Sequence, residues 1–145
     1  MAIKISKMDV WVGEIEDKAG GLAEVLDPVA KTGANFEFII ARRQQERMGS
    51  GVLFVTPIKG KRAQDAARSA GLYQAERIST LKVEGDDRPG VTSEISKAIG
   101  NAGVSMRGLS GAAIGRKFVH FIGFDSGADA DKAAKAIKAA IAKKK

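Results

Sequence analysis

The chain has 145 residues, of which 44% are hydrophobic and 28% charged, with no cysteine and a formal net charge of +7. This composition is typical of a folded globular protein and excludes disulfide bonds, thiolate metal sites and cysteine nucleophiles. No apolar run approaches the ~20 residues of a membrane-spanning helix, and the N-terminus lacks the apolar core of a signal peptide. We therefore expect a cytoplasmic protein that makes no membrane contact.

The first half of the chain shows helical and strand-like patterns in alternation. Leu22, Val25, Leu26 and Val29 recur at helical spacing, and Gly33 supplies a helix stop. The expected elements are a strand at 10–15, a turn at 17–20, a helix at 22–31, strands at 35–41 and 52–56, a helix at 62–70 and a strand at 73–78.

The second half repeats this order but ends before a fourth strand. The expected elements are a strand at 80–84, helix 92–100, strand 104–109, a glycine-rich hairpin loop "SGAAIG", strand 117–124 and a helix at 130–142. The segment 2–7 alternates apolar and polar residues. We expect it to fill the missing edge position, within the chain or across a dimer.

A shift of seventy residues superposes the two halves without a gap. It places Asp17 on Asp87, Gly20 on Gly90 and Glu24 on Glu94. The repeat predicts two domains, residues 1–78 and 79–145, with residues 1–7 as an edge strand for the second. Each has the order βαββαβ, so the fold class is α+β, with two ferredoxin-like sandwiches built on antiparallel sheets. Because the strands are apolar on both faces, we also expect a homodimer or a closed pair of domains.

The turn "DDRPG" before the second-half helix has a direct physical interpretation. Asp87 is a candidate N-cap or Asx-turn residue, Pro89 fits the first helical turn, and Gly90 allows backbone to approach closely. The N-terminus of a helix suits a carboxylate or phosphate. A purely structural turn explains the same residues equally well.

The stretches "VEGDDRPGVTSEISKAIGNAGVSM" and "GEIEDKAGGLAEVLDPVAKTGANF" resemble the ACT domain family, whose pattern is a strand, Asp-x-Pro-Gly-Leu, and a helix ending in Gly-hydrophobic-Asn. The resemblance covers almost the whole chain in two copies. It implies a stand-alone, non-catalytic tandem ACT protein that binds a small-molecule ligand, commonly an amino acid, between paired domains. An enzyme or regulator of amino-acid metabolism is the implied partner.

In this family the strand-to-helix loop of one domain faces the second strand of its neighbour. Copy one departs from the pattern at Ala19, and copy two at Val91 and Ser105. We favour copy one, because it keeps Gly-Gly-Leu and the asparagine. The ligand-binding positions that the resemblance implies are Asp17, Gly20, Gly21, Leu22, Asn35, Asp87, Pro89, Gly90, Val91 and Ser105.

The patterns of common catalytic and cofactor sites are missing. His120 is the only histidine, and it lies on an expected strand with no second histidine or cysteine to share a metal. A buried strand histidine is the favoured interpretation. There is no Gly-x-Ser-x-Gly, Walker loop or Gly-x-Gly-x-x-Gly. We expect no catalytic residues, no metal and no cofactor.

The alternative function is an RNA- or DNA-binding module, or a transcriptional or post-transcriptional regulator, that uses the basic C-terminal half. RNA recognition motifs share the βαββαβ order. "RKFVHFIGF" resembles their basic-aromatic third strand. The second half is also the more basic, with 13 basic and 8 acidic residues against 11 and 9 in residues 1–75, largely because of six lysines after Asp131. Lysines at a helix C-terminus also complement the helix dipole. The first strand "TLKVEG" lacks an aromatic residue for base stacking, which favours the ligand sensor.

Overall fold

The computed structural model describes residues 2–142. They form two compact units, one of residues 9–75 and one that combines residues 2–8 with residues 76–142. No helix within residues 2–142 is long and apolar enough to cross a membrane. Residues 143–145, half of the six-lysine tail, lie outside the described residues.

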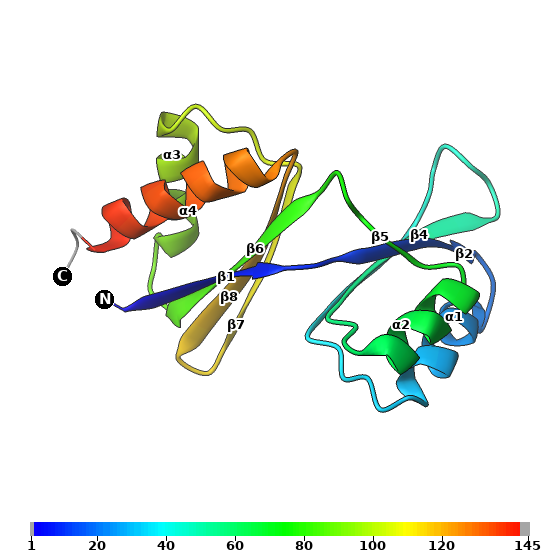
Figure 1. Ribbon diagram of the computed structural model, residues 1–145. Helices are drawn as coiled ribbons and strands as arrows, with labels where there is room; N and C mark the ends of the chain where they lie inside the picture. Colours follow the sequence, from blue (N-terminus) through cyan, green and yellow to red (C-terminus); the bar gives the residue numbers. More distant parts are fainter. Residues whose placement is uncertain (1, 143–145) are drawn as a thin grey trace. The chain divides into compact units, whose positions relative to one another are not determined.

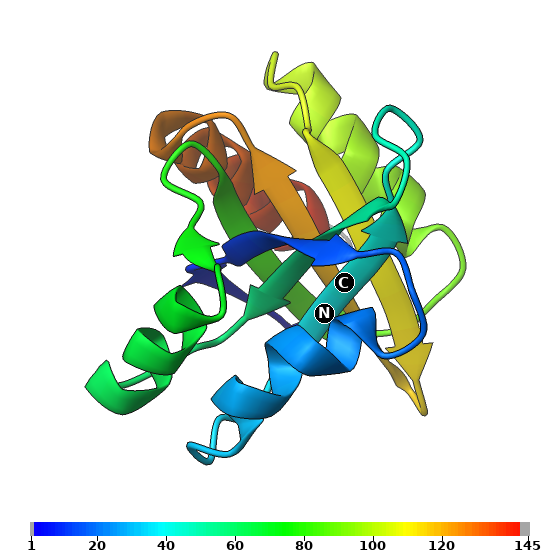
Figure 2. The same ribbon diagram turned by 90° about the vertical axis from the view of Figure 1, so that its right-hand side faces the viewer.

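Six elements make up the unit of residues 9–75: β2 (Trp11–Glu16), α1 (Gly21–Ala30), β3 (Phe38–Arg43), β4 (Ser50–Thr56), α2 (Lys61–Ser69) and β5 (Tyr73–Gln74). The strands form one antiparallel sheet in the order β3-β4-β2-β5. In Figure 2, α1 (blue) and α2 (green) lie side by side on one face of it. The last strand is shorter than expected, because it pairs only with Trp11 and Val12.

The other unit contains β1 (Ile3–Met8), β6 (Ser79–Asp86), α3 (Val91–Asn101), β7 (Gly108–Ile114), β8 (Lys117–Phe124) and α4 (Gly127–Ala142). Its antiparallel sheet has the order β1-β6-β8-β7. β1 pairs with β6 within the same chain, from Ile3 opposite Gly85 to Met8 opposite Thr80. β1 therefore occupies the edge position beside β6. The equivalent position in the other unit, beside β2, is occupied by β5. Both α3 and α4 cover one face of the sheet (Figure 1).

One expected loop is a strand instead. The sequence "SGAAIG" was interpreted as a glycine-rich hairpin loop after a strand at 104–109, and this prediction is wrong. β7 runs from Gly108 to Ile114 and pairs with β8 along its whole length. The hairpin contains only Gly115 and Arg116, and Gly115 has φ +61°, as a two-residue turn requires. The small residues of this segment suggested a loop. In the structure they suit a strand, because Gly111 of β7 lies directly against the His120 ring of β8.

Each unit has its own hydrophobic core between its sheet and its two helices. Trp11 is the largest buried side chain of the first core, and Phe118 and Phe124 are the largest of the second. The remaining buried core residues of the first unit are Val29, Leu53, Val55, Ile58, Ala63, Ala67 and Leu72.

The sheet of residues 9–75 is also apolar on the face away from its helices. Val12 lies opposite Phe54 on β4, and Phe54 lies opposite Ile40 on β3. These residues alternate with Trp11, Leu53 and Val55 of the core, so they share the other face. This row of Val12, Phe54 and Ile40 matches the expectation of two apolar faces. In the second sheet the equivalent row is more polar, because it consists of Lys82, Phe121 and Ser110.

Candidate functional site

The loop between β2 and α1 is tied down at Asp17. Its backbone N–H donates to the Gly49 carbonyl at 3.0 Å. Its carboxylate oxygen Oδ2 lies 2.6 Å from Nε of Arg43, at the end of β3. The side chain therefore connects the loop to the sheet and does not cap α1. The ion pair joins residues on separate elements, so its partner could not be read from the local sequence.

Gly20 and Gly21 shape the start of α1 by different means. Gly20 is the N-cap in the left-handed conformation, φ 82°, and no side chain caps the helix. Gly21 is buried against the loop, where an added Cβ would lie 2.0 Å from the Glu16 carbonyl oxygen. Its N–H donates to the Lys18 carbonyl at 3.0 Å. Gly21 is therefore required by packing, and its amide is already paired.

Two other amides at the start of α1 remain open. Within residues 2–142, the backbone N–H groups of Leu22 and Ala23 have no acceptor, whereas the next amide, of Glu24, donates to the Gly20 carbonyl at 3.0 Å. Free amides in the first turn follow from helix geometry, and they carry the positive end of the helix dipole. The sequence does not single out Ala23, because the loop pattern that the family resemblance supplies ends at Leu22.

The charged side chains around this loop form ion pairs with one another. Nζ of Lys18 lies 3.1 Å from a Glu16 carboxylate oxygen and 3.2 Å from one of Glu24. Hydrogen bonds to Glu16 and then Glu24 raise the pKa of the Lys18 ammonium. Asp17 and Arg43 are also paired, and together these three carboxylates and two cations carry one net negative charge. Recognition of an anion there depends on the open amides.

The second copy repeats the backbone geometry with different side chains. Gly90 is the N-cap of α3 at φ 85°, and no side chain caps this helix either. The N–H of Asp87 donates to the Arg116 carbonyl at 2.8 Å, and the N–H of buried Val91 donates to the Arg88 carbonyl at 3.3 Å. The prediction that Asp87 is an N-cap is wrong, because Gly90 holds that position. Pro89 precedes the N-cap, so its expected place in the first helical turn is wrong too.

The loops and the second-strand positions lie at opposite ends of their sheets. The N–H of Asp17 bonds to Gly49, just before β4, whereas the N–H of Glu37, two residues after Asn35, bonds to the carbonyl of Thr56 at the end of β4. Seven strand residues span roughly 20 Å at ~3.4 Å per residue. Within this unit, therefore, Asp17 and Asn35 do not meet.

The same separation holds in the second copy. The N–H of Asp87 bonds to Arg116, just before β8, whereas the N–H of Arg107, two residues after Ser105, bonds to the Gly123 carbonyl near the end of β8. Neither unit by itself therefore brings a loop and a second-strand position into one site.

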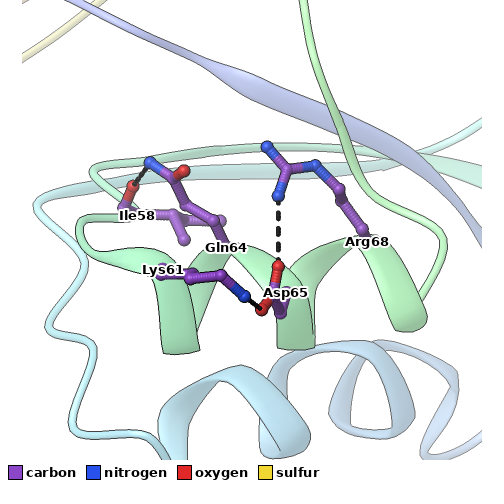
Figure 3. A network of polar contacts seen from close by, with 5 residues as sticks. All are labelled: Ile58, Lys61, Gln64, Asp65 and Arg68. Carbon is purple, nitrogen blue, oxygen red and sulfur yellow. Dashed lines mark hydrogen bonds and ion pairs between the residues drawn. The ribbon is translucent and has the colours of Figure 1, made fainter.

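Asn35 instead borders a hollow of about 480 Å³ between the C-terminal end of α1 and the start of α2. Lys59, Lys61 and Arg62 line it as well. Figure 3 shows that Lys61 is engaged along the helix, where its Nζ lies 2.8 Å from Asp65 Oδ2. The same carboxylate also accepts from Arg68 at 3.5 Å. The pair lowers the pKa of Asp65, first through the hydrogen bond from Lys61.

His120 is a buried histidine in the core-facing row of β8, with 4% of its surface exposed. Its Nε2 lies 2.9 Å from Oγ1 of Thr92, in the first turn of α3. Within the described residues its Nδ1 is buried without a partner. Burial lowers the pKa of His120, and the nearby Asp87 carboxylate opposes that shift. Residues 2–142 contain no group of three or more His, Cys, Asp or Glu side chains that could hold a metal.

No protein-family model and no curated protein matches the sequence. The structure is similar to the ligand-free regulatory subunit of aspartate kinase from Thermus thermophilus, with 16% identity, a TM-score of 0.68 and 97% of each chain covered. It is also similar to a protein of Bacteroides thetaiotaomicron, with 17% identity, a TM-score of 0.74, and 94% of this chain and 88% of that chain covered. Both units have the ACT-type fold.

Aspartate kinase of Clostridium acetobutylicum is similar as well, at 18% identity and a TM-score of 0.65, over 98% of this chain and 34% of that one. The expected fold class, two ferredoxin-like βαββαβ sandwiches of ACT type, is thereby confirmed. At identities of 16–18% the likeness establishes the fold of this chain.

Proposed function

We propose that this chain is a regulatory protein without catalytic activity, and that it binds a small carboxylate, in the first place an amino acid, at the loop between β2 and α1. The observation that carries the proposal is the pair of open amides of Leu22 and Ala23 at the start of α1. Two adjacent donors at the positive end of a helix match the two oxygens of a carboxylate.

The ion pair beside the amides supplies a place for an amino group. Only Oδ2 of Asp17 is engaged by Arg43 Nε. The carboxylate still has acceptor capacity on its other oxygen, and 31% of the side chain is exposed. The α-ammonium group of a bound amino acid would donate a hydrogen bond to this free oxygen of Asp17. The loop between β6 and α3 has an equivalent ion pair, Arg88–Glu94. Val91 and Ser105, however, stand where the first copy has glycine and asparagine, so we propose the loop between β2 and α1 as the main site.

A neighbouring domain completes the site in this proposal. Asn35 cannot reach the loop of its own unit, so an Asn35 that contacts the ligand comes from another copy. Val12 of the apolar row is buried, whereas Phe54 and Ile40 are partly exposed and provide an apolar surface for association. We therefore propose a homodimer, and light scattering should give twice the monomer mass. A monomer at micromolar concentration would contradict this part of the proposal.

The comparisons support a partner as well as a ligand. Two of the similar structures are described as a regulatory subunit of aspartate kinase and as an allosteric aspartate kinase. We propose that this chain regulates an enzyme of amino-acid metabolism in the cytoplasm, itself needing no cofactor.

Nucleic-acid binding is less well supported by the positions of the aromatic residues. A stacking platform needs aromatic side chains on the open face of the sheet. On β8, Phe118 and Phe124 lie in the hydrophobic core on the helix side, together with His120. Only Phe121 has the opposite orientation, and it is 8% exposed.

A thermal-shift screen across the twenty amino acids tests the proposed function. A ligand that binds only the folded chain raises the melting temperature in proportion to ln(1 + [L]/Kd). We expect at least one amino acid to raise it in the native protein. No shift with any of the twenty at millimolar concentration would refute amino-acid binding.

A further inference from the structure

The contact between His120 and Thr92 joins β8 to the start of α3. His120 Nε2 and Thr92 Oγ1 are 2.9 Å apart. On its other side the ring lies against the edge strand β7, where a Cβ added to Gly111 would lie 2.3 Å from Cδ2 of His120. The imidazole therefore occupies a space that exists only because residue 111 is glycine. It connects three elements of the unit.

The other unit shows that the fold does not need this arrangement. Shifting by seventy residues places Leu22 at the position of Thr92. The sheet register places Leu53 at the position of His120, since Gly13 opposes Leu53 as Val83 opposes His120. Ala41 opposes Leu53 just as Gly111 opposes His120. Leucine, leucine and alanine thus fill the place of threonine, histidine and glycine, and Leu53 is fully buried in its core.

The imidazole is well accommodated only in its neutral form. A neutral ring can share one proton with Thr92 through Nε2. A protonated ring has a second N–H at Nδ1, and that atom is buried without a partner in the described residues. A buried donor without an acceptor is unfavourable, and a buried charge is more so. Protonation therefore favours any conformation in which the ring reaches water.

The surroundings of the ring contain one carboxylate that favours the charged form, Asp87 in the loop before α3. Next to it, Arg88 is paired with Glu94 of α3. The strands on either side bring no charge to this face, because β7 has no charged residue and the facing residue of β6 is Val83. From α4 the core-facing residues include Ile137 and Ile141, while its described lysines are exposed.

We propose that Thr92, His120 and Gly111 form a proton-operated latch on the loop of residues 87–90 and the first turn of α3. The neutral ring holds this segment against β8. When the ring takes up a proton, it leaves its place beside Gly111, gives up the contact with Thr92 and moves toward water and the Asp87 carboxylate. The latch acts on the conformation of the loop, whether or not a ligand binds there.

Amide hydrogen exchange of the intact chain, followed by NMR between pH 7.5 and 5, tests the latch. The reporter amides are those of Asp87 and Glu94, which donate to the carbonyls of Arg116 and Gly90. The opening constant of these amides, corrected for intrinsic exchange, should rise by up to about tenfold per pH unit below about 6.5, because the open form binds one more proton. The matched amides of Asp17 and Glu24 in the other unit should show no such rise.

Two variants provide the control. Replacing Thr92→Leu, His120→Leu and Gly111→Ala together installs the residues of the other unit and should make the opening constants independent of pH. If that variant does not fold, His120→Gln, which cannot take up a proton in this range, gives the same test. The latch is overturned if the pH response persists in a folded variant, if all four amides respond equally, or if Asp87 and Glu94 do not respond in the native chain.

Discussion

Gly20 and Gly90, seventy residues apart in the sequence, adopt the same left-handed backbone conformation, with φ and ψ of 82° and −4° at Gly20 and of 85° and −2° at Gly90. Each is the N-cap of a helix that no side chain caps. Side-chain capping would have occupied an amide of the first turn. A glycine N-cap leaves those amides open, which is the feature that both ACT-type loops share.

Replacing Gly20 by valine should weaken amino-acid binding strongly while the chain stays folded. A Cβ at this position meets no atom within 4 Å, so the penalty is conformational. A β-branched residue in the left-handed region costs roughly 1–2 kcal/mol, and the loop should change shape to avoid it. Calorimetry measures the binding and circular dichroism the folding.

Gly71→Val is the matched control for this substitution. Gly71 also has a positive φ, 93°, with open space around a Cβ, but it lies beyond the C-terminal end of α2. We expect a similar loss of stability without a loss of affinity. If both variants lost affinity equally, the effect of Gly20→Val would be on the fold and not on the loop.

Substitution of Asp17 by asparagine should weaken ligand binding strongly and lower the stability of the chain only slightly. In its ion pair the Arg43 side chain is largely exposed and Asp17 is partly exposed, so the free energy of unfolding should fall by less than about 1 kcal/mol. A charge-assisted hydrogen bond to a ligand ammonium group contributes about 1.5–3 kcal/mol, so the dissociation constant should rise roughly ten- to a hundredfold. Asp27→Asn, which breaks the exposed pair with Lys31, should leave affinity unchanged. Equal affinity of the Asp17 variant and the native chain would remove Asp17 from the site.

Substitution of Gly111 by alanine should destabilise the chain through His120. The added methyl group would lie 2.3 Å from Cδ2 of the imidazole, and overpacking of this kind costs about 1–3 kcal/mol. His120→Leu in the same chain should relieve much of the cost, as Leu53 opposite Ala41 does in the other unit. Urea unfolding of the single and double variants measures the coupling, and fully additive effects would show that the two side chains do not meet.

The stability of the chain should decrease as the pH falls below about 6.5. Burial lowers the pKa of folded His120 from its usual 6.5, so the unfolded chain takes up a proton first as the pH decreases. The free energy of unfolding should therefore be unaffected by this group above pH 6.5. Below that it should fall by up to about 1.4 kcal/mol per pH unit until the folded pKa is reached. Urea unfolding at pH 7.5, 6.5 and 5.5 checks this, and the His120→Leu variant should lack the contribution.

Local patterns predicted the elements whose signals are periodic. The limits of β8, Lys117–Phe124, agree with the expectation, because Phe118, His120, Ile122 and Phe124 alternate on one face. The small residues of β7 gave no such signal, since a strand of glycine, serine and alanine resembles a turn. The register of β7 is set by its pairing with β8, and a local sequence pattern does not contain that information.

The contacts that shape the two loops join residues distant in sequence. Asp17 meets Arg43, and Thr92 meets His120, only after the sheets have formed. The capping role expected for Asp87 failed for a local reason, because the loop ends with a left-handed glycine three residues later. The repeat did contain a signal for the Thr92–His120 contact. Aligning the two halves places the polar Thr92 at the position of the apolar Leu22, which marks Thr92 as different.

The most direct test of the central claim is an NMR titration of the isotopically labelled chain with the amino acid that gives the largest thermal shift. If the first loop binds the carboxylate through open amides, the largest chemical-shift changes should fall on Leu22 and Ala23, and the Gly20→Val variant should lack them. The account is contradicted if no amino acid shifts these amides while single-stranded RNA shifts residues of β8 with a steep dependence on salt.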